Sequence, residues 1–294
     1  MLILISDAFD ATLPDKLAKY GEVTDDKDRV SDAEVVLIRS KTKVTKEYVD
    51  NAPNLKLVIR GGVGLDNVDI PYCQSKGILV YNTAEASSVA VAELAFAMMI
   101  AMPNHIVKAD TTMREKTWAK KELKRTELLG KTLGILGLGR IGSALATRAK
   151  AFGMRVVAFD PFVNFSDFSQ MITDIDEVLS MSDYLSMHLP LMDSTKGFLN
   201  KERIAKMKDG AYVINTGRGK TAVEEDVAEA LKSGKLAGYA NDVWYSDPPD
   251  WDSPLISAPN TLLAPHIGAS TKENMLRIGI IIDNLIGQYV ANKG

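Results

Sequence analysis

The 294-residue sequence has one cysteine, three histidines and almost no net charge. A single Cys cannot build a disulfide framework within one chain, which is typical of proteins from a reducing compartment. The 35 Lys and Arg residues nearly balance the 38 Asp and Glu residues, for a formal charge of −3. General nucleic-acid binders need a basic surplus. The composition therefore excludes a disulfide-stapled scaffold and argues against a nucleic-acid partner.

Long hydrophobic runs are also scarce. The most apolar stretch, residues 89–102, contains Glu93 and stops at Pro103. It falls short of the ~18 residues that a membrane span needs. The first ten residues carry Asp7 and Asp10 and lack a basic region, so they predict a buried strand rather than a signal peptide. We expect a cytoplasmic protein without a membrane partner.

Short β-branched runs alternate with segments of helical period through most of the chain. Most of the runs are continuously apolar, which is typical of strands covered on both faces and therefore of parallel sheets with crossover helices. The predicted fold class is α/β with doubly wound parallel sheets. The expected strands cover residues 2–5, 35–38, 57–59, 78–81, 132–136, 155–159, 184–187, 211–214, 238–242 and 261–263.

So many strands are natural for two sheets, and the strand rhythm stops between residues 95 and 129. The segment Ser270 to Glu273 has the spacing of a capping box and precedes apolar residues at helical period. A last helix that returns to the first sheet makes the first domain discontinuous. We therefore predict one domain of residues 1–97 and 268–294, and a second domain of residues 98–267.

A predicted strand runs into a G-x-G-x-x-G turn made by Gly137, Gly139 and Gly142, and a helical segment follows. In a dinucleotide site these glycines allow a tight turn, close approach of the pyrophosphate and close helix packing. Asp160 ends the next strand, 18 residues after Gly142, where an acid hydrogen-bonds the adenosine ribose and repels a 2′-phosphate. Residues 161–163 include no Arg or Lys. The pattern predicts NAD rather than NADP as the cofactor.

Hydride transfer to or from a hydroxy or keto group needs a proton carrier with a pKa near 7. His266 follows an apolar strand and precedes a Gly turn, at the sheet edge where α/β sites form, and is our candidate. His105 stands at a helix end and is expected to be a cap or a surface residue. His188 stands at a strand exit, where a place in the NAD pocket and a structural role are both open.

A cation must also hold the acid group of such a substrate. Arg218 ends an apolar strand between two glycines, and its planar fork suits a carboxylate. The alternative is a surface Arg in a turn. A carboxylate beside the imidazole of His266 orients it, and spacing alone does not choose between Asp242 and Asp247.

These segments resemble the D-isomer-specific 2-hydroxyacid dehydrogenases, in family order over nearly the whole chain: residues 61–69, 137–142, 188–191, 215–219, 242–244 and 265–268. The resemblance implies a flavodoxin-like substrate domain, a Rossmann NAD-binding domain and a homodimer. It also implies that Arg218 binds the substrate carboxylate and carbonyl and that His266 is the acid/base. Residues expected to line NAD are Gly137, Gly139, Arg140, Ile141, Gly142, Asp160, His188, Pro190, Thr216, Asp242 and Gly268.

Two positions depart from the family pattern. Gly217 stands where the family usually has Ala before the Arg, which is a minor change. Asp247 stands where the family has Glu and is one methylene shorter, so we expect either a longer bond to His266 or a compensating backbone. Asp242 resembles the family residue that hydrogen-bonds the nicotinamide carboxamide.

The first domain carries the substrate signals. Arg39 and Arg60 each follow an apolar strand, and two cations at one sheet edge suit a phosphate, although both are also compatible with ordinary solvated residues. By the resemblance, the amides of Val63 and Gly64 meet the substrate carboxylate. Residues 39–45 and 126–134 are similar to the phosphoglycerate dehydrogenases of the family. In those enzymes, Arg residues at the positions of Arg39 and Arg60 hold the phosphate.

The sequence thus predicts NAD-dependent oxidation of 3-phospho-D-glycerate to 3-phosphooxypyruvate, in serine biosynthesis. The alternatives are a glyoxylate or hydroxypyruvate reductase on the same frame and, in another class, a non-enzymatic NAD(H)-sensing protein, which Arg218 and His266 disfavour. The chain ends soon after the last predicted helix, so we expect no feedback through the C-terminal serine-sensing domain of longer relatives. No His, Cys and carboxylate cluster has metal-ligand spacing, so no metal is expected.

Overall fold

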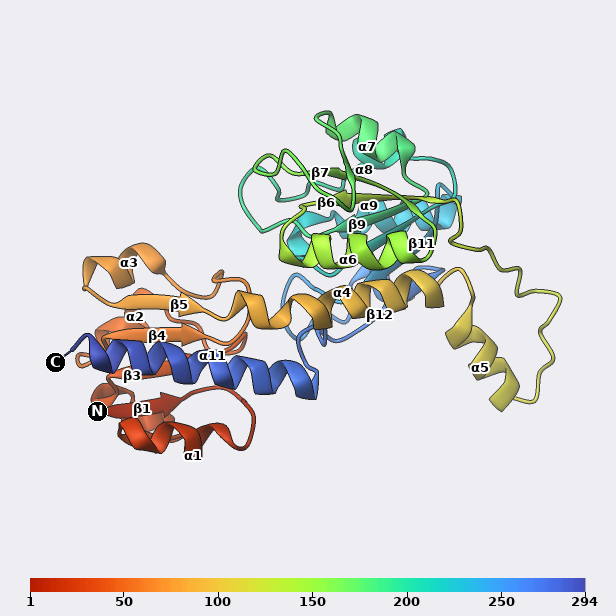
Figure 1. Ribbon diagram of the computed structural model, residues 1–294. Helices are drawn as coiled ribbons and strands as arrows, with labels where there is room; N and C mark the ends of the chain where they lie inside the picture. The colour runs from red at the N-terminus through yellow and green to blue at the C-terminus, as the bar shows by residue number, and fades with distance from the viewer. Residues whose placement is uncertain (294) are drawn as a thin grey trace. The chain divides into compact units, whose positions relative to one another are not determined.

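The computed structural model describes residues 1–293, which form two compact units (Figure 1). Unit 1 comprises Met1–Ser88 and Ala269–Gly294, and unit 2 comprises Val89–Gly268. The first boundary thus lies at Ser88, whereas the sequence placed it at residue 97, because one continuous helix, α4 (Ala84–Ala101), crosses from one unit into the other. In this division the segment that begins at Ala269 belongs with the first 88 residues.

Unit 1 is built on a five-stranded parallel sheet in the order β2-β1-β3-β4-β5. Its strands alternate with short helices, and the last helix of the chain joins them. Because every strand pair is parallel, all five carboxyl ends lie at one edge of the sheet. The elements are β1 (Leu2–Ile5), α1 (Leu13–Leu17), η1 (Ala18–Tyr20), β2 (Glu22–Thr24), η2 (Lys27–Asp32), β3 (Val35–Ile38), α2 (Lys46–Asp50), β4 (Leu57–Arg60), α3 (Ile70–Ser75), β5 (Leu79–Asn82) and α11 (Lys272–Ala291).

Alternate residues of these strands enter two different cores, as expected of a sheet covered on both faces. On one face, Ile3 and Leu37 pack with apolar residues of α1 and α11. On the other face, Leu4 and Val36 pack with residues of α2 and α3. Helix α11 begins after Thr271, whose side chain accepts a hydrogen bond from the Asn274 amide. The cap is therefore one residue later than the capping box that began at Ser270.

Unit 2 is built on a seven-stranded parallel sheet in the order β12-β11-β10-β9-β6-β7-β8. The strand order reverses between β6 and β9, and doubly wound sheets place their ligands at such a point. The elements after α4 are α5 (Ile106–Arg114), β6 (Thr132–Leu136), α6 (Arg140–Ala151), β7 (Arg155–Phe159), β8 (Gln170–Met171), α7 (Ile175–Met181), β9 (Tyr184–Met187), α8 (Lys201–Lys206), β10 (Ala211–Asn215), η3 (Gly219–Thr221), α9 (Glu224–Ser233), β11 (Leu236–Asn241), α10 (Pro254–Ser257) and β12 (Thr261–Leu263).

Two hydrophobic cores cover the two faces of this sheet as well. One contains buried residues of α4 and α6, among them Met99 and Leu145. The other contains buried residues of α7, α8 and α9. The two sheets with helices on both faces confirm the predicted α/β class with two doubly wound domains.

Helix α4 begins at Ala84, five residues before the apolar run of residues 89–102. Its 18 residues are apolar enough, by length and composition alone, to cross a membrane. Slightly more than half of it, 56%, is buried inside the protein, where Ala92, Ala95 and Met99 pack in a core of unit 2. The helix therefore serves as a core element of a folded unit.

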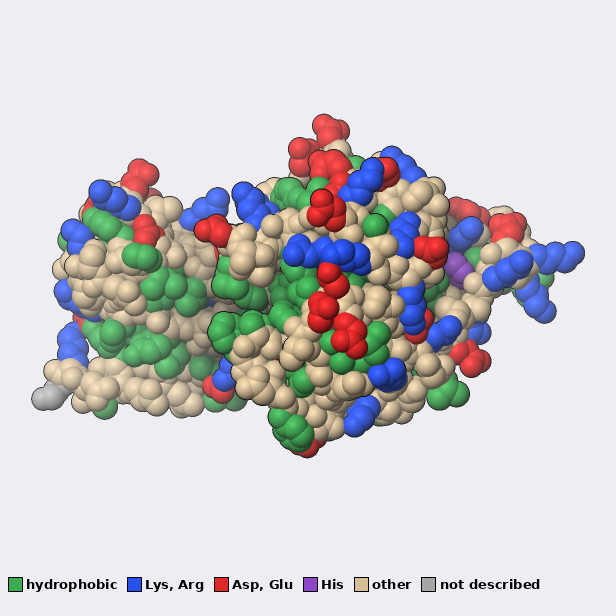
Figure 2. Space-filling model, turned by 90° about the horizontal axis from the view of Figure 1, so that it is seen from above, with side chains coloured by type: hydrophobic (Ala, Val, Ile, Leu, Met, Phe, Trp, Pro, Cys, Tyr) green, Lys and Arg blue, Asp and Glu red, His purple; other side chains and the backbone are tan. Residues whose placement is uncertain are grey.

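Charged side chains of both signs lie on the surface. On the face drawn in Figure 2, Lys and Arg side chains are interspersed with Asp and Glu. This distribution agrees with the near balance of 35 basic and 38 acidic residues in the sequence.

Candidate active site and cofactor site

The turn between β6 and α6 has the geometry of an anion cradle. Gly137 has φ +89°, a left-handed conformation that favours glycine. A Cβ on Gly142 would lie 2.3 Å from the carbonyl oxygen of Gly137, so only glycine lets the helix start this close to the turn. Gly139 is the N-cap of the 12-residue helix α6, and no side chain caps it. The first amides of α6 can therefore hold a pyrophosphate.

Asp160 follows β7 and is tied to the same turn. Its Oδ2 atom accepts a hydrogen bond of 2.8 Å from the Leu138 amide, and its Oδ1 atom accepts one of 2.8 Å from the Phe162 amide. Each carboxylate oxygen can accept a further bond. Asp160 therefore lies beside the glycine turn, with capacity left for a ribose hydroxyl.

Two buried polar atoms at neighbouring strand ends also fit a polar ligand. The Nδ1 atom of His188 and the Oγ1 atom of Thr216 are buried and make no hydrogen bond within the described part of the chain. The other ring nitrogen of His188 lies 2.9 Å from the buried Ser186 hydroxyl. Buried polar atoms normally have partners, so these two favour a bound molecule. Ser186 was missed by the sequence analysis, and its place two residues before His188 in the strand was the available signal.

Burial lowers the pKa of His188 to about 4, so its imidazole is neutral near pH 7. A His with a lowered folded-state pKa binds fewer protons when folded, so it destabilises the fold as the pH falls from about 6.5 to 4. We expect the cofactor-free protein to lose up to about 3 kcal/mol through this group. Unfolding by urea at several pH values should show a shallower pH dependence in His188→Asn. Parallel curves for the variant and the wild type would contradict the lowered pKa.

His266 and Asp247 lie together at the carboxyl edge of the unit 2 sheet. His266 follows β12, and Asp247 lies in the segment that follows β11. The Nδ1 atom of His266 is 2.5 Å from Oδ2 of Asp247. The shorter Asp side chain therefore reaches the imidazole, and the longer bond considered from the sequence is not observed. With Nδ1 engaged, Nε2 is the nitrogen that can exchange a proton with a ligand.

Asp242 holds the backbone on either side of this imidazole. Its Oδ1 and Oδ2 atoms accept hydrogen bonds of 2.8 Å from the amides of Ile267 and Gly268 respectively. Burial raises the pKa of Asp242, and the two amides and His266 oppose that rise. His266 itself has φ +56°, a left-handed conformation that is uncommon outside glycine. Asp242 therefore fixes a strained turn, a role that sequence spacing did not reveal.

Arg218 follows β10 at the same edge of the sheet. Its Nη1 atom donates 2.8 Å to the Gly217 carbonyl oxygen. The Arg218 carbonyl oxygen accepts bonds from the Thr221 hydroxyl at 2.6 Å and from the Asn215 side chain at 3.1 Å. The backbone that carries the guanidinium is therefore held in place. Arg218, Asp247 and His266 all follow adjacent strands, β10, β11 and β12.

Four of the predicted substrate contacts, Arg39, Arg60, Val63 and Gly64, lie in unit 1. Arg39 directly follows β3, and Arg60 ends β4, its parallel neighbour. A Cβ on Gly62 would lie 1.9 Å from Nη1 of Arg60, so this guanidinium covers the start of the 61–64 loop. The Asn82 side chain donates to the Val63 carbonyl oxygen at 2.6 Å. Val63 and Gly64 thus belong to a braced loop beside a cation.

Comparison with known proteins agrees with this geometry. The model of the D-isomer specific 2-hydroxyacid dehydrogenase NAD-binding domain matches residues 96–268. The chain is 44% identical over 253 residues to hydroxypyruvate reductase of Thermotoga maritima, covering 85% of this chain and 83% of that protein. It is 39% identical over 270 residues to D-3-phosphoglycerate dehydrogenase of Methanocaldococcus jannaschii, covering 90% of this chain and 51% of that protein.

A solved structure extends the likeness to the whole fold. D-lactate dehydrogenase of Aquifex aeolicus, complexed with NAD and lactic acid, has a TM-score of 0.89 at 29% identity, with 99% of this chain and 96% of that chain covered. The chain therefore belongs to the D-isomer specific 2-hydroxyacid dehydrogenase family. It is an NAD-dependent dehydrogenase that acts on the CH–OH group of a small 2-hydroxy acid. The chain spans about half the length of the phosphoglycerate dehydrogenases it matches.

Proposed function

We propose that the chain catalyses NAD-dependent oxidation of 3-phospho-D-glycerate to 3-phosphooxypyruvate. The observation that carries this proposal is the position of Arg39. It lies at the strand end next to Arg60, and its buried Nε atom makes no hydrogen bond within residues 1–293. A second cation beside a carboxylate-binding loop suits a substrate with a second anionic group. Phosphoglycerate dehydrogenases among the relatives support the same substrate.

Three groups are proposed to bind the carboxylate of the substrate. Arg218 offers a planar guanidinium that binds a carboxylate with two parallel hydrogen bonds. The amides of Val63 and Gly64 supply neutral donors on a loop held by Asn82. Arg39 and Arg60 then hold the phosphate.

NAD, when bound, supplies the hydride acceptor for C2 of the substrate. His266 takes the proton of the C2 hydroxyl on Nε2, so that the C–OH group becomes a carbonyl. Asp247, bonded to Nδ1, orients the ring and stabilises the imidazolium that forms. His188 does not take this role, since burial lowers its pKa to about 4.

The proposed NAD contacts follow the shape of unit 2. Gly137, Gly139, Arg140, Ile141 and Gly142 form the cradle at the start of α6, and Asp160 binds the adenosine ribose. The remaining groups lie at or after the ends of β9, β10, β11 and β12: His188, Pro190, Thr216, Asp242 and Gly268. The buried and unpartnered atoms of His188 and Thr216 support this arrangement.

The direct test follows NADH consumption with 3-phosphooxypyruvate, hydroxypyruvate, glyoxylate and pyruvate at matched concentrations. We expect a strong preference for the phosphorylated acid. Arg39→Ala should raise KM for 3-phosphooxypyruvate about tenfold to a hundredfold, because a hydrogen bond to a charged group is lost. The same variant should change KM for hydroxypyruvate less than threefold.

A second candidate is a hydroxypyruvate reductase. The observation that favours it is the 44% identical hydroxypyruvate reductase, 83% of whose length is covered. A flat or reversed substrate preference, together with an Arg39→Ala variant that behaves like the wild type, would establish this candidate and reject the phosphorylated substrate. A homodimer, a cytoplasmic location and a place in serine biosynthesis remain predictions.

A further inference from the structure

The turn that carries Arg39 is held by one acidic side chain. The Oδ2 atom of Asp7 accepts hydrogen bonds from the Arg39 amide at 2.6 Å and from the Thr42 amide at 3.1 Å. Its Oδ1 atom accepts from the Thr42 hydroxyl at 2.8 Å. Asp7 comes from the loop after β1, far from Arg39 in the sequence. One carboxylate thus fixes both ends of residues 39–42, which we call the Arg39 turn.

Asn67, which follows the Arg39 turn in the sequence, also bonds to this turn. Its Nδ2 atom donates to the carbonyl oxygens of Arg39, at 2.8 Å, and of Thr42, at 2.6 Å. Val44 and Val68 form a parallel bridge nearby. The Val44 amide also donates 2.8 Å to the Asn67 carbonyl oxygen. The Arg39 turn is therefore bonded to the segment that continues from the 61–64 loop.

These contacts hold the backbone of the turn and do not involve the Arg39 side chain, which can therefore bind a ligand. Asp7 directs both oxygens to two amides and one hydroxyl, and the Nε atom of Arg39 has no hydrogen-bond partner among the described residues. Burial lowers the pKa of Arg39, and the nearby charge of Asp7 opposes that change. A cation held by its backbone with an unused donor is prepared for an anionic ligand.

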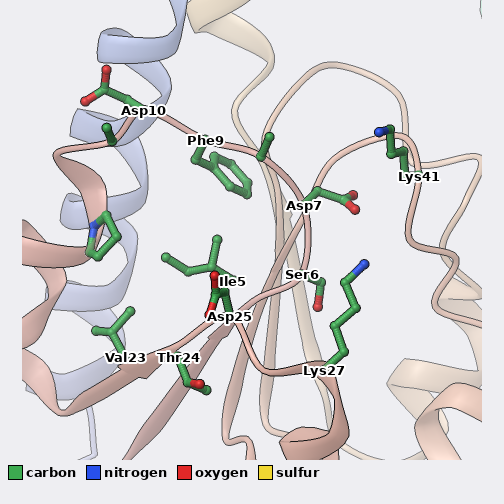
Figure 3. Close-up of a pocket in the computed structure, with 13 residues that line it drawn as sticks. Ile5, Ser6, Asp7, Phe9, Asp10, Val23, Thr24, Asp25, Lys27 and Lys41 are labelled. Atoms are coloured by element: carbon green, nitrogen blue, oxygen red, sulfur yellow. The ribbon is translucent and has the colours of Figure 1, made fainter.

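Figure 3 shows the surroundings of Asp7. Its carboxylate points toward the segment that bears Lys41, at one side of a cavity of about 680 Å³. The cavity lies at the carboxyl ends of β1 and β2. On another part of its lining, the Oδ1 atom of Asp10 accepts hydrogen bonds from the amide and the hydroxyl of nearby Thr12. None of the proposed catalytic residues lines it. Asp7 therefore faces the Arg39 turn. Asp10, on the same loop, is suited as the control position for variants of Asp7.

We propose that Asp7 and Asn67 are positioning residues that set substrate specificity through Arg39. They fix the distance between the Arg39 guanidinium and the 61–64 loop, so that one site accepts a carboxylate and a phosphate on the same three-carbon acid. The proposal rests on the proposed function, because it needs Arg39 to bind the phosphate. Neither residue contacts the substrate in this account.

A general structural role would have different consequences. Loss of packing or stability would lower Tm and affect all substrates alike. If positioning is lost, the Arg39 side chain must become ordered when the substrate binds. This cost weakens only the contact between Arg39 and the phosphate. The ratio of KM values for phosphorylated and unphosphorylated acids separates the two.

The experiment measures kcat, KM and Tm for Asp7→Ala, Asp7→Asn, Asn67→Ala and Thr42→Val, with 3-phosphooxypyruvate and hydroxypyruvate. Asp7→Ala and Asn67→Ala should each raise KM for the phosphorylated acid about tenfold, and KM for hydroxypyruvate less than twofold. Asp7→Asn should recover most of the loss, since an amide oxygen accepts both backbone bonds and its NH2 group donates to the Thr42 hydroxyl. Thr42→Val, the mildest change, should raise KM two- to fivefold.

The controls separate this proposal from the proposed function. Asp10→Asn should match the wild type. In an Arg39→Ala background, Asp7→Ala should add no further loss for the phosphorylated acid, because its effect runs through Arg39. If Arg39→Ala leaves KM for the phosphorylated acid unchanged, the proposed function is wrong. If Arg39→Ala acts but the Asp7, Asn67 and Thr42 variants change both substrates equally or neither, the positioning proposal is overturned. An Asp7→Asn variant as poor as Asp7→Ala would also overturn it.

Discussion

His266→Ala is expected to lower kcat by about 10²- to 10⁴-fold, the usual contribution of a general acid or base. The imidazole lies 2.5 Å from the Asp247 carboxylate through Nδ1, which leaves Nε2 for the proton of the substrate hydroxyl. NADH binding should be unchanged, because the proposed cofactor cradle lies at the start of α6. Steady-state kcat and a direct NADH titration measure the two effects separately.

His105→Ala is the matched control for this variant. His105 stands at the N-cap position of α5, and its Nε2 atom lies 2.9 Å from the Lys124 carbonyl oxygen, outside the proposed site. We expect its kcat to equal that of the wild type. A His266→Ala enzyme that retains more than a tenth of wild-type kcat would remove His266 as the proton carrier.

Arg218→Ala is expected to lower kcat/KM by about 10²- to 10³-fold for any 2-keto acid, because a charge-paired contact to the substrate is lost. Its backbone is fixed by Thr221 and Asn215, so the loss comes from the side chain rather than from a displaced loop. Arg218→Lys keeps the charge but not the planar fork, and should fall between Ala and wild type.

The neighbouring exposed cation, Lys220, provides the control, and Lys220→Ala should leave kcat/KM unchanged. Neutral 2-hydroxy alcohols or ketones that lack a carboxylate should be equally poor substrates for the wild type and for Arg218→Ala. Should Arg218→Ala stay within threefold of the wild type on 2-keto acids, Arg218 does not bind the carboxylate.

The sequence predicted the buried strands well, and it missed two strands at the sheet edges. Continuous apolar runs such as residues 2–5 and 132–136 coincide with β1 and β6, since strands buried on both faces need apolar residues at every position. The strands β2 and β8 were missed. Each is short, lies at a sheet edge and is partly exposed, so no apolar run marks it.

The candidate site shows a similar division. Residues that follow a strand within a motif, such as Arg218 and His266, were predictable because the carboxyl ends of parallel strands meet at one edge. The contact between Asp242 and the turn of His266 was not predictable, nor was that of Asp7 with the Arg39 turn. Both join segments more than 20 residues apart, and their geometry depends on how loops fold rather than on local spacing.

The return of α11 to unit 1 bears on the order in which the chain folds during synthesis. Ile278, Ile282 and Ile286 are fully buried against residues of β1 and β3. The first 88 residues therefore leave the ribosome without the helix that closes one of their two cores, and wait on the order of ten seconds or more while unit 2 is made. The sequence of unit 2 is complete before α11 is made. Unit 1 is therefore expected to reach its native structure last, although most of it is translated first.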